Sequence, residues 1–206
     1  MQSILSLENK HLGEDIYILA AGKSVDFYPK NFLDDRIVIG VNHTWKMFDV
    51  TYSVFKEMDG KPNVPLIMPK HSHGLSATPL NEADYIFEHN HNECAEIKFD
   101  GVHPYGEKII VSWSSITSAI HLAAFMGARA VFLIGHDCAT LDNYQIAEGY
   151  YNGARPATAS GDYPIWVGKI APQTAIVRDW LLKEYGVPLI SLSPFIGLKH
   201  EGHEIA

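Results

Sequence analysis

The sequence predicts an α/β domain with a mostly parallel sheet and helices on both faces. Several short strand-like runs are apolar throughout, which is typical of strands buried on both sides. Helical stretches separate some of these runs, as parallel strands require a crossover connection. Polar residues follow the ends of the runs, where ligands bind in such sheets. We therefore expect a Rossmann-like single domain over residues 1–206.

The apolar runs predict the positions of the strands along the chain. We expect strands at residues 16–20, 36–41, 51–55, 64–68, 84–87, 108–113, 130–134 and 188–193. The stretch ITSAIHLAAFMGA predicts a helix that ends near Gly127, and its apolar residues on nearly every face imply burial. A second helix should span about 172–185, with Pro172 in its first turn and Gly186 just past its end.

Two segments are less regular. Residues 56–107 or so are rich in His, Asn and Pro and predict an irregular insertion. Their histidines include two His-x-His pairs, which zinc can use, but no Cys-x-x-Cys or HExxH motif accompanies them. We therefore expect solvated loop histidines and no metal site. Residues 149–169 are aromatic and rich in small residues, and a loop of this length predicts a lid.

Composition excludes several classes of protein. The 206 residues carry 16 basic and 24 acidic side chains, a net charge of −8, and no basic stripe, so we expect no nucleic-acid partner. No apolar run approaches the roughly 18 residues of a membrane helix, so we expect no transmembrane segment. The N-terminus lacks the pattern of a signal peptide, and two cysteines make no disulfide framework. We expect a cytoplasmic protein; composition leaves a homo-oligomer open.

The first candidate site is Ala21-Gly22-Lys23-Ser24, directly after the first apolar run. Gly22 would let backbone amides approach a phosphate, and Ser24 would add a hydroxyl donor. Neither GxGxxG nor the Walker lysine motif is present. The alternative is a plain strand-to-helix turn with Ser24 as its N-cap.

The second candidate is the start of the Ala-rich helix, where hydroxyl residues gather at Ser112, Ser114, Ser115, Thr117 and Ser118. One serine would suffice as an N-cap. The additional hydroxyls, with the positive end of the helix dipole, suit a phosphate or carboxylate. The alternative is a capped, buried helix start whose small residues allow close packing.

The third candidate is Gly135-His136-Asp137, which follows the run at 130–134. An acidic residue at this position accepts hydrogen bonds from a ribose or base, binds magnesium, or acts as a base. The alternative is a loop aspartate that caps the next turn. We interpret His136 as a satisfied loop histidine.

These motifs together resemble the superfamily that joins the Campylobacter-type bacterial sialyltransferases with the 6-hydroxymethylpterin diphosphokinase-like proteins, which include motility-associated glycosyltransferases. The resemblance covers roughly 16–56 and 108–198. The family opens with a strand and a G-x-G-P-S-L-like loop, continues with a strand ending in Asn, and has a Thr-Ser helix start and a strand ending in Gly-x-Asp. The matching strings here are Ala21-Gly22-Lys23-Ser24-Val25, Gly40-Val41-Asn42, Ile116-Thr117-Ser118, Ile134-Gly135-His136-Asp137 and Trp166-Val167-Gly168-Lys169.

The resemblance implies a site for a nucleotide or nucleotide-sugar. Its binding residues would be Gly22, Ser24, Asn42, Ser115, Thr117, Ser118 and Gly135, and its catalytic residues Asp137 and Lys169. Lys169 stands where the sialyltransferases carry a catalytic histidine, Ser115 replaces a family arginine and Ala139 a family tyrosine. A lysine is a poor base at pH 7, so its expected role is to stabilise the charge of the leaving group.

Three functions follow as expectations. The first is a glycosyltransferase-like enzyme that moves a sugar from a nucleotide-sugar to an acceptor glycan or small molecule, with no cofactor indicated. The second is a diphosphokinase-like enzyme that uses ATP and magnesium near Asp137. The third is a nucleotide-binding module without catalysis, which the missing family residues favour.

Overall fold

The structure, a computed structural model, describes residues 2–55, 61–69, 80–91, 108–111, 114–138, 146–149 and 163–193. The eight strands that the sequence predicts are all present, and a short strand precedes them. The strands are β1 (Gln2–Ser3), β2 (Asp15–Leu19), β3 (Ile37–Val41), β4 (Tyr52–Val54), β5 (Leu66–Pro69), β6 (Tyr85–His91), β7 (Lys108–Val111), β8 (Ala130–Ile134) and β9 (Leu189–Ser191).

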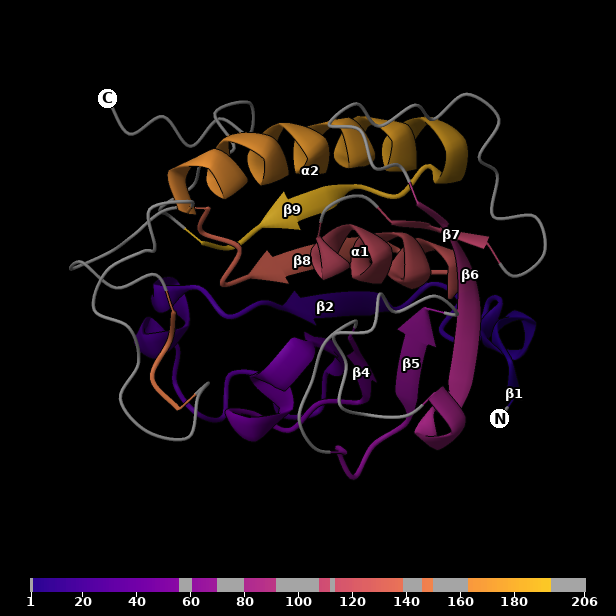
Figure 1. Cartoon of the computed structure of the whole chain (residues 1–206), viewed down its shortest axis with the longest axis horizontal. Helices are drawn as coiled ribbons and strands as arrows, with labels where there is room; N and C mark the ends of the chain where they lie inside the picture. Colours follow the sequence, from indigo (N-terminus) through magenta and orange to yellow (C-terminus); the bar gives the residue numbers. More distant parts are fainter. Residues whose placement is uncertain are drawn as a thin grey trace.

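These strands form one parallel sheet. Eight of them follow the order β1-β6-β5-β4-β3-β2-β8-β9, and β7 pairs with the second half of β6. Every pairing is parallel, so the predicted mostly parallel sheet is confirmed. The register sets Leu19 at the end of β2 opposite Gly40 of β3 and Ile134 of β8. The arrowheads of β2, β8 and β9 consequently point to the same side in Figure 1.

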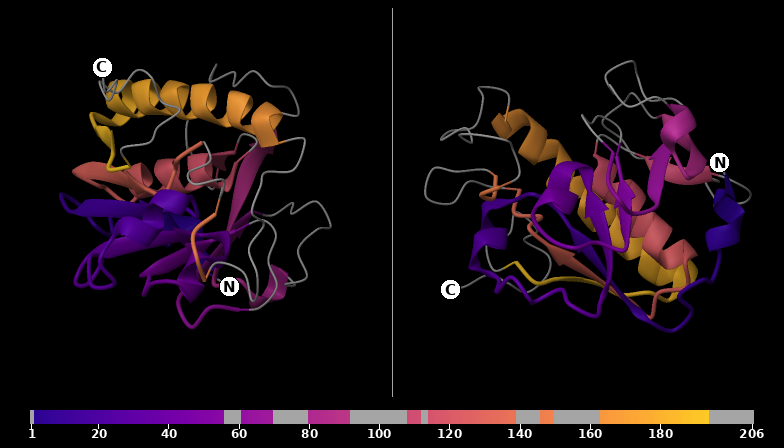
Figure 2. Two further views of the ribbon diagram at one scale, coloured as in Figure 1. Left: turned by 90° about the vertical axis from the view of Figure 1, so that its left-hand side faces the viewer. Right: turned by 90° about the horizontal axis from the view of Figure 1, so that it is seen from below.

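The helices α1 (Ser115–Phe125) and α2 (Tyr163–Tyr185) pack against each other and share one face of the sheet (Figure 2). Both contribute to a single core with alternate residues of the central strands, such as Ile16 and Ile18. All eleven residues of α1 are buried, as its composition predicts. Gly127, which follows the C-cap residue Met126, has a φ of +86°, and this confirms the predicted helix end near Gly127.

The prediction of helices on both faces of the sheet is therefore wrong for α-helices in the described part of the chain. The opposite face is covered by the short 3-10 helices η2 (Lys23–Phe27) and η3 (Asn42–Lys46) and by turns. Pro29 has no amide proton, and Asp35 adopts a φ of +59°, so the connection after η2 cannot continue as an α-helix.

The middle segment is more regular than expected. Within residues 56–107, β5 and β6 join the main sheet, which corrects the prediction of an irregular insertion for this part. Leu66, Ile67 and Met68 of β5 are all fully buried, because core residues lie on both faces of the sheet there. His89 and His91 lie in β6, not in a loop.

The second helix also begins earlier than expected. It starts at Tyr163, so the last seven residues of the predicted lid, 163–169, are helical. Residues 150–162 of that lid lie outside the described residues. Pro172 stands inside α2, not in its first turn. A proline removes one backbone donor and can be accommodated where packing stabilises the rest of the helix. No helix in the described ranges is long and apolar enough to span a membrane.

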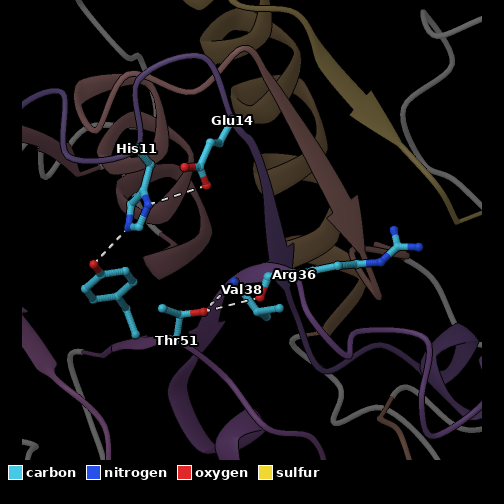
Figure 3. Close-up of polar contacts among 6 residues, drawn as sticks. His11, Glu14, Arg36, Val38 and Thr51 are labelled. Atoms are coloured by element: carbon cyan, nitrogen blue, oxygen red, sulfur yellow. Dashed lines mark hydrogen bonds and ion pairs between the residues drawn. The ribbon is translucent and has the colours of Figure 1, made fainter.

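Side-chain hydrogen bonds and an ion pair connect residues at the edge of the sheet where β2, β3 and β4 begin (Figure 3). His11 Nε2 and Tyr52 Oη share a hydrogen bond of 2.9 Å, and His11 lies 3.9 Å from the Glu14 carboxylate. The Val38 amide donates to Thr51 Oγ1 at 3.0 Å, and that hydroxyl donates to the Arg36 carbonyl. The polar groups of this amino edge are thus paired with one another.

Candidate active site at the carboxyl edge

A pocket of about 310 Å³ lies at the opposite edge, where the central strands end. Its size falls in the range of small-molecule sites. Residues after β2, β3 and β8 line it, together with the start of α1 and Ile170 of α2. Of the predicted site residues, the pocket brings together Gly22, Asn42, Gly135 and Asp137. Their convergence follows from the parallel sheet, which directs all strand ends to one edge.

Buried hydrogen bonds join the segments that follow β2, β8 and β9. Gly135 N–H donates to Ser193 Oγ at 3.0 Å, and Ser193 Oγ lies 3.1 Å from Ser24 Oγ. Ser24 Oγ donates to Asp137 Oδ1 at 2.5 Å, and Ser24 N–H donates to Asp137 Oδ2 at 2.7 Å. The two donors of Ser24 are both oriented toward the Asp137 carboxylate. Burial raises the pKa of Asp137 above its usual range, although the hydrogen bonds from Ser24 act in the opposite direction.

Asp137 therefore caps the start of η2. A Cβ on Gly22 would lie 2.6 Å from Asp137 Oδ2 and 2.4 Å from the Gly135 carbonyl oxygen, so this close approach requires glycine. Gly22 N–H donates to Gly135 O at 2.7 Å, so the amides of Gly22 and Ser24 are both bonded within the protein. The arrangement is a strand-to-helix turn, as the alternative has it, but its N-cap is Gly22 and not Ser24, and the Asp137 carboxylate occupies the place of a phosphate.

The N-terminus of α1 opens into the same pocket. Ser114 is the N-cap, its Oγ accepts from Ile116 N–H at 3.2 Å, and both residues line the pocket. The first amides of a helix have no acceptor within the helix and carry a partial positive charge. This end of α1 is suited to an anion.

The three predicted hydroxyl residues of α1 lie behind that opening. Ser115, Thr117 and Ser118 are 9%, 0% and 2% exposed and are not among the residues that line the pocket. Thr117 Oγ1 donates to the Ser114 carbonyl at 2.8 Å. Ser118 Oγ is buried without a hydrogen-bond partner among the described residues.

Asn42 follows β3 and has a φ of +55°, a left-handed conformation that asparagine tolerates better than most residues. It lines the pocket, and its Oδ1 is buried with no partner in the described part of the chain. A buried acceptor without a donor is costly unless a ligand supplies one. Asn42 therefore marks a position where a ligand N–H or O–H would be stabilised.

His136 lines the pocket between β8 and α2 and is 7% exposed. Its Nε2 lies 2.9 Å from Thr174 Oγ1 of α2. Cys138 Sγ lies 3.5 Å from Nε2 and 3.9 Å from Nδ1. Burial lowers the pKa of His136 to about 4 and raises the pKa of the Cys138 thiol to about 12. Both groups are neutral at pH 7.

Lys169 lies on α2, one residue before Ile170, which lines the pocket. The predicted lid position for Lys169 is corrected to a helical one, and its side chain lies outside the described residues.

The residues that could bind a metal do not gather in the described ranges. No group of three or more His, Cys, Asp or Glu side chains there is arranged to hold a metal ion. Both oxygens of Asp137, the expected magnesium ligand, accept hydrogen bonds from Ser24.

Sequence reasoning names Ser114 in the second candidate site but does not include it among the binding residues; it treats His136 as a satisfied loop histidine and does not identify Thr174. Ser114 was detectable as the last residue before the helical pattern, where an N-cap is preferred. Thr174 gave no local signal, because its contact with His136 joins residues 38 positions apart.

Comparison of the chain with protein-family models gives no match, and no curated protein matches it.

Proposed function

We propose that this protein is a transferase that uses a nucleotide-activated donor, most specifically a nucleotide-sugar. The observation that carries this proposal is the opening of the buried α1 N-terminus, at Ser114, into a pocket at the carboxyl edge of a parallel sheet. A helix start in such a position favours a phosphate group. The motif resemblance supports glycosyl transfer as the reaction.

The phosphate is assigned to α1 and not to the Gly22 loop. The amides of Gly22 and Ser24 are already bonded, one of them to the Asp137 carboxylate, and a second anion beside that carboxylate would be repelled. Asn42 Oδ1 would accept a hydrogen bond from the nucleoside or the sugar. Asp137 then acts mainly by holding the η2 turn in place.

Catalysis would be a direct displacement at the sugar carbon. The bond between that carbon and the phosphate oxygen breaks, and the nucleotide leaves with the electron pair. Lys169, next to the pocket-lining Ile170, is proposed to stabilise the negative charge of the leaving nucleotide. The magnesium-dependent alternative depends on Asp137 as a ligand, and the Ser24 hydrogen bonds make that carboxylate a poor one.

Calorimetric titration with CMP, CDP, GDP, UDP and ATP, with and without magnesium, tests the proposal. We expect one nucleoside class to bind without magnesium. Asn42→Gly keeps a backbone that tolerates positive φ and removes the side chain, and it should weaken binding by about 0.5–1.5 kcal/mol. Asn9→Gly is the matched control, because Asn9 also has a positive φ, 54°, and does not line the pocket.

Equal affinity in wild type and Asn42→Gly would contradict the assignment of the pocket. ATP binding that requires magnesium would favour the diphosphokinase reading. Tight binding with no turnover of any donor would assign the protein to the class of binding modules.

A further inference from the structure

The proton on the His136 ring can be assigned from its neighbours. Thr174 has one hydroxyl proton, which it donates to the Ile170 carbonyl at 3.0 Å. Thr174 Oγ1 can therefore only accept from His136 Nε2, 2.9 Å away. Nε2 carries the ring proton, and Nδ1 carries the lone pair.

The Nδ1 lone pair has no strong donor among the described residues. Its one hydrogen-bond contact among the described residues is with the Cys138 thiol at 3.9 Å, and a protonated thiol is a weak donor. Burial lowers the pKa of His136 to about 4, so the ring is neutral and Nδ1 is unprotonated at pH 7; a negative charge nearby is needed before Nδ1 takes up a proton.

The pocket residues on the α2 side of His136 are apolar or weakly polar. Cys138, Ile146 and Ile170 line the same pocket, and Cys138 packs against Ala171 and Ala175 of α2. An ionised acceptor would lose its hydration here without gaining a counter-charge from these side chains. A neutral hydroxyl compound suits this side of the pocket better than a carboxylate or a phosphate.

We propose that the His136 side of the pocket binds an acceptor with a neutral hydroxyl group, and that His136 Nδ1 removes the hydroxyl proton as this oxygen attacks the sugar carbon. This inference rests on the proposed transferase function. The acceptor O–H proton passes to Nδ1 and the new O–C bond forms. The bond to phosphate breaks, and its electron pair leaves with the nucleotide. The ring keeps its Nε2–H bond to Thr174 throughout, so Thr174 is a positioning residue. The positive charge that forms on the ring arises together with the negative charge of the leaving phosphate, and the two offset each other.

Nitrogen NMR of the ¹⁵N-histidine-labelled protein tests the proton assignment without any activity. His136→Gln identifies the His136 signals. We expect a neutral ring at pH 7 with the proton on Nε2, and a change in tautomer populations in Thr174→Val that Thr174→Ser reverses. A ring protonated on Nδ1 would overturn the inference whatever the enzyme does.

Nucleotide release from CMP-, UDP- and GDP-linked sugars, with water as the hydroxyl acceptor, tests the chemistry. His136→Gln should lower kcat about 100-fold or more, with the donor KM and the nucleotide Kd little changed. Thr174→Val should lower kcat less, and Thr174→Ser should restore it. His11→Gln, at the amino edge, is the matched control with unchanged rates.

The outcomes separate the two proposals. Failure of every nucleotide to bind the wild type would overturn the proposed function. Binding and turnover with equal kcat in wild type and His136→Gln would leave that function standing and overturn the role of His136. If nucleotides bind but no nucleotide is released from any donor, both the role of His136 as a base and the proposed glycosyl transfer are overturned.

Discussion

His121 makes the folded protein sensitive to acid. This histidine of α1 is 0% exposed, its Nε2 shares a 3.0 Å hydrogen bond with Tyr185 Oη, and the Trp180 ring packs edge-on against it. Burial lowers the pKa of His121 to about 3, whereas an unfolded chain would titrate it near its ordinary value of 6.5. Between these values the unfolded state binds more protons. The stability that His121 contributes is complete above pH 6.5 and is lost as pH falls toward 3.

The size of the loss follows from the two pKa values. From pH 7 to pH 5, His121 should cost about 2 kcal/mol of unfolding free energy, since each pH unit below its unfolded pKa is worth about 1.4 kcal/mol. His136, with a pKa of about 4, should add a comparable loss. Asp137 has a raised pKa and acts in the opposite direction, because its folded state takes up a proton first.

Urea denaturation at pH 7 and pH 5 measures the effect in wild type and in His121→Phe. Phenylalanine keeps an aromatic ring against Trp180 and cannot be protonated. Its lost hydrogen bond to Tyr185 should lower stability equally at both pH values, so it cancels in the difference. We expect the loss between pH 7 and pH 5 to be about 2 kcal/mol smaller in the variant. The same loss in both proteins would refute the reasoning.

Three further predictions concern the site. Gly22→Ala should destabilise the fold by about 1–3 kcal/mol in urea denaturation, because its Cβ would meet Asp137 and Gly135 at 2.6 and 2.4 Å; unchanged stability would contradict the close packing. Ser118→Ala should raise stability by about 1 kcal/mol, since it removes a buried hydroxyl without a partner among the described residues; a loss of nucleotide affinity in calorimetry would instead show that this hydroxyl binds the ligand. Lys169→Ala should reduce kcat for nucleotide release more than nucleotide affinity, because the charge it neutralises develops in the transition state; equal rates would remove Lys169 from the mechanism.

The strands and their direction were predictable from the sequence because apolar runs need burial wherever the chain goes. Runs such as 16–20 and 130–134 are apolar on both faces, which only a covered parallel sheet satisfies. The buried helix after Ser114 was predictable for the same reason, and Gly127 marked its end through a backbone conformation that glycine favours. The convergence of Gly22, Asn42 and Asp137 at one edge follows from parallel strands alone.

Which segments pack on the two faces of the sheet was decided by tertiary packing. The connection over residues 20–36 is long enough for an α-helix. It folds instead as a 3-10 helix followed by turns, which cover the hydrophobic cluster on the sheet face opposite α1 and α2. Helix α2 begins at Tyr163, nine residues before the proline that predicted its start. Local propensity is small against the burial free energy of a whole helix face, so packing decided both outcomes.

The roles of the polar residues were decided only by the tertiary structure. Asp137 looks like a ligand-binding residue in the sequence, and the fold places it against Ser24, which is 113 positions away. His136 looks like a satisfied loop residue, and the fold places its Nε2 2.9 Å from Thr174 Oγ1, a residue 38 positions away. A carboxylate or an imidazole has the same local sequence signal whether it is bonded internally or free. Hydrogen bonds depend on distances of a few tenths of an ångström between distant segments, and only the packed chain sets those distances.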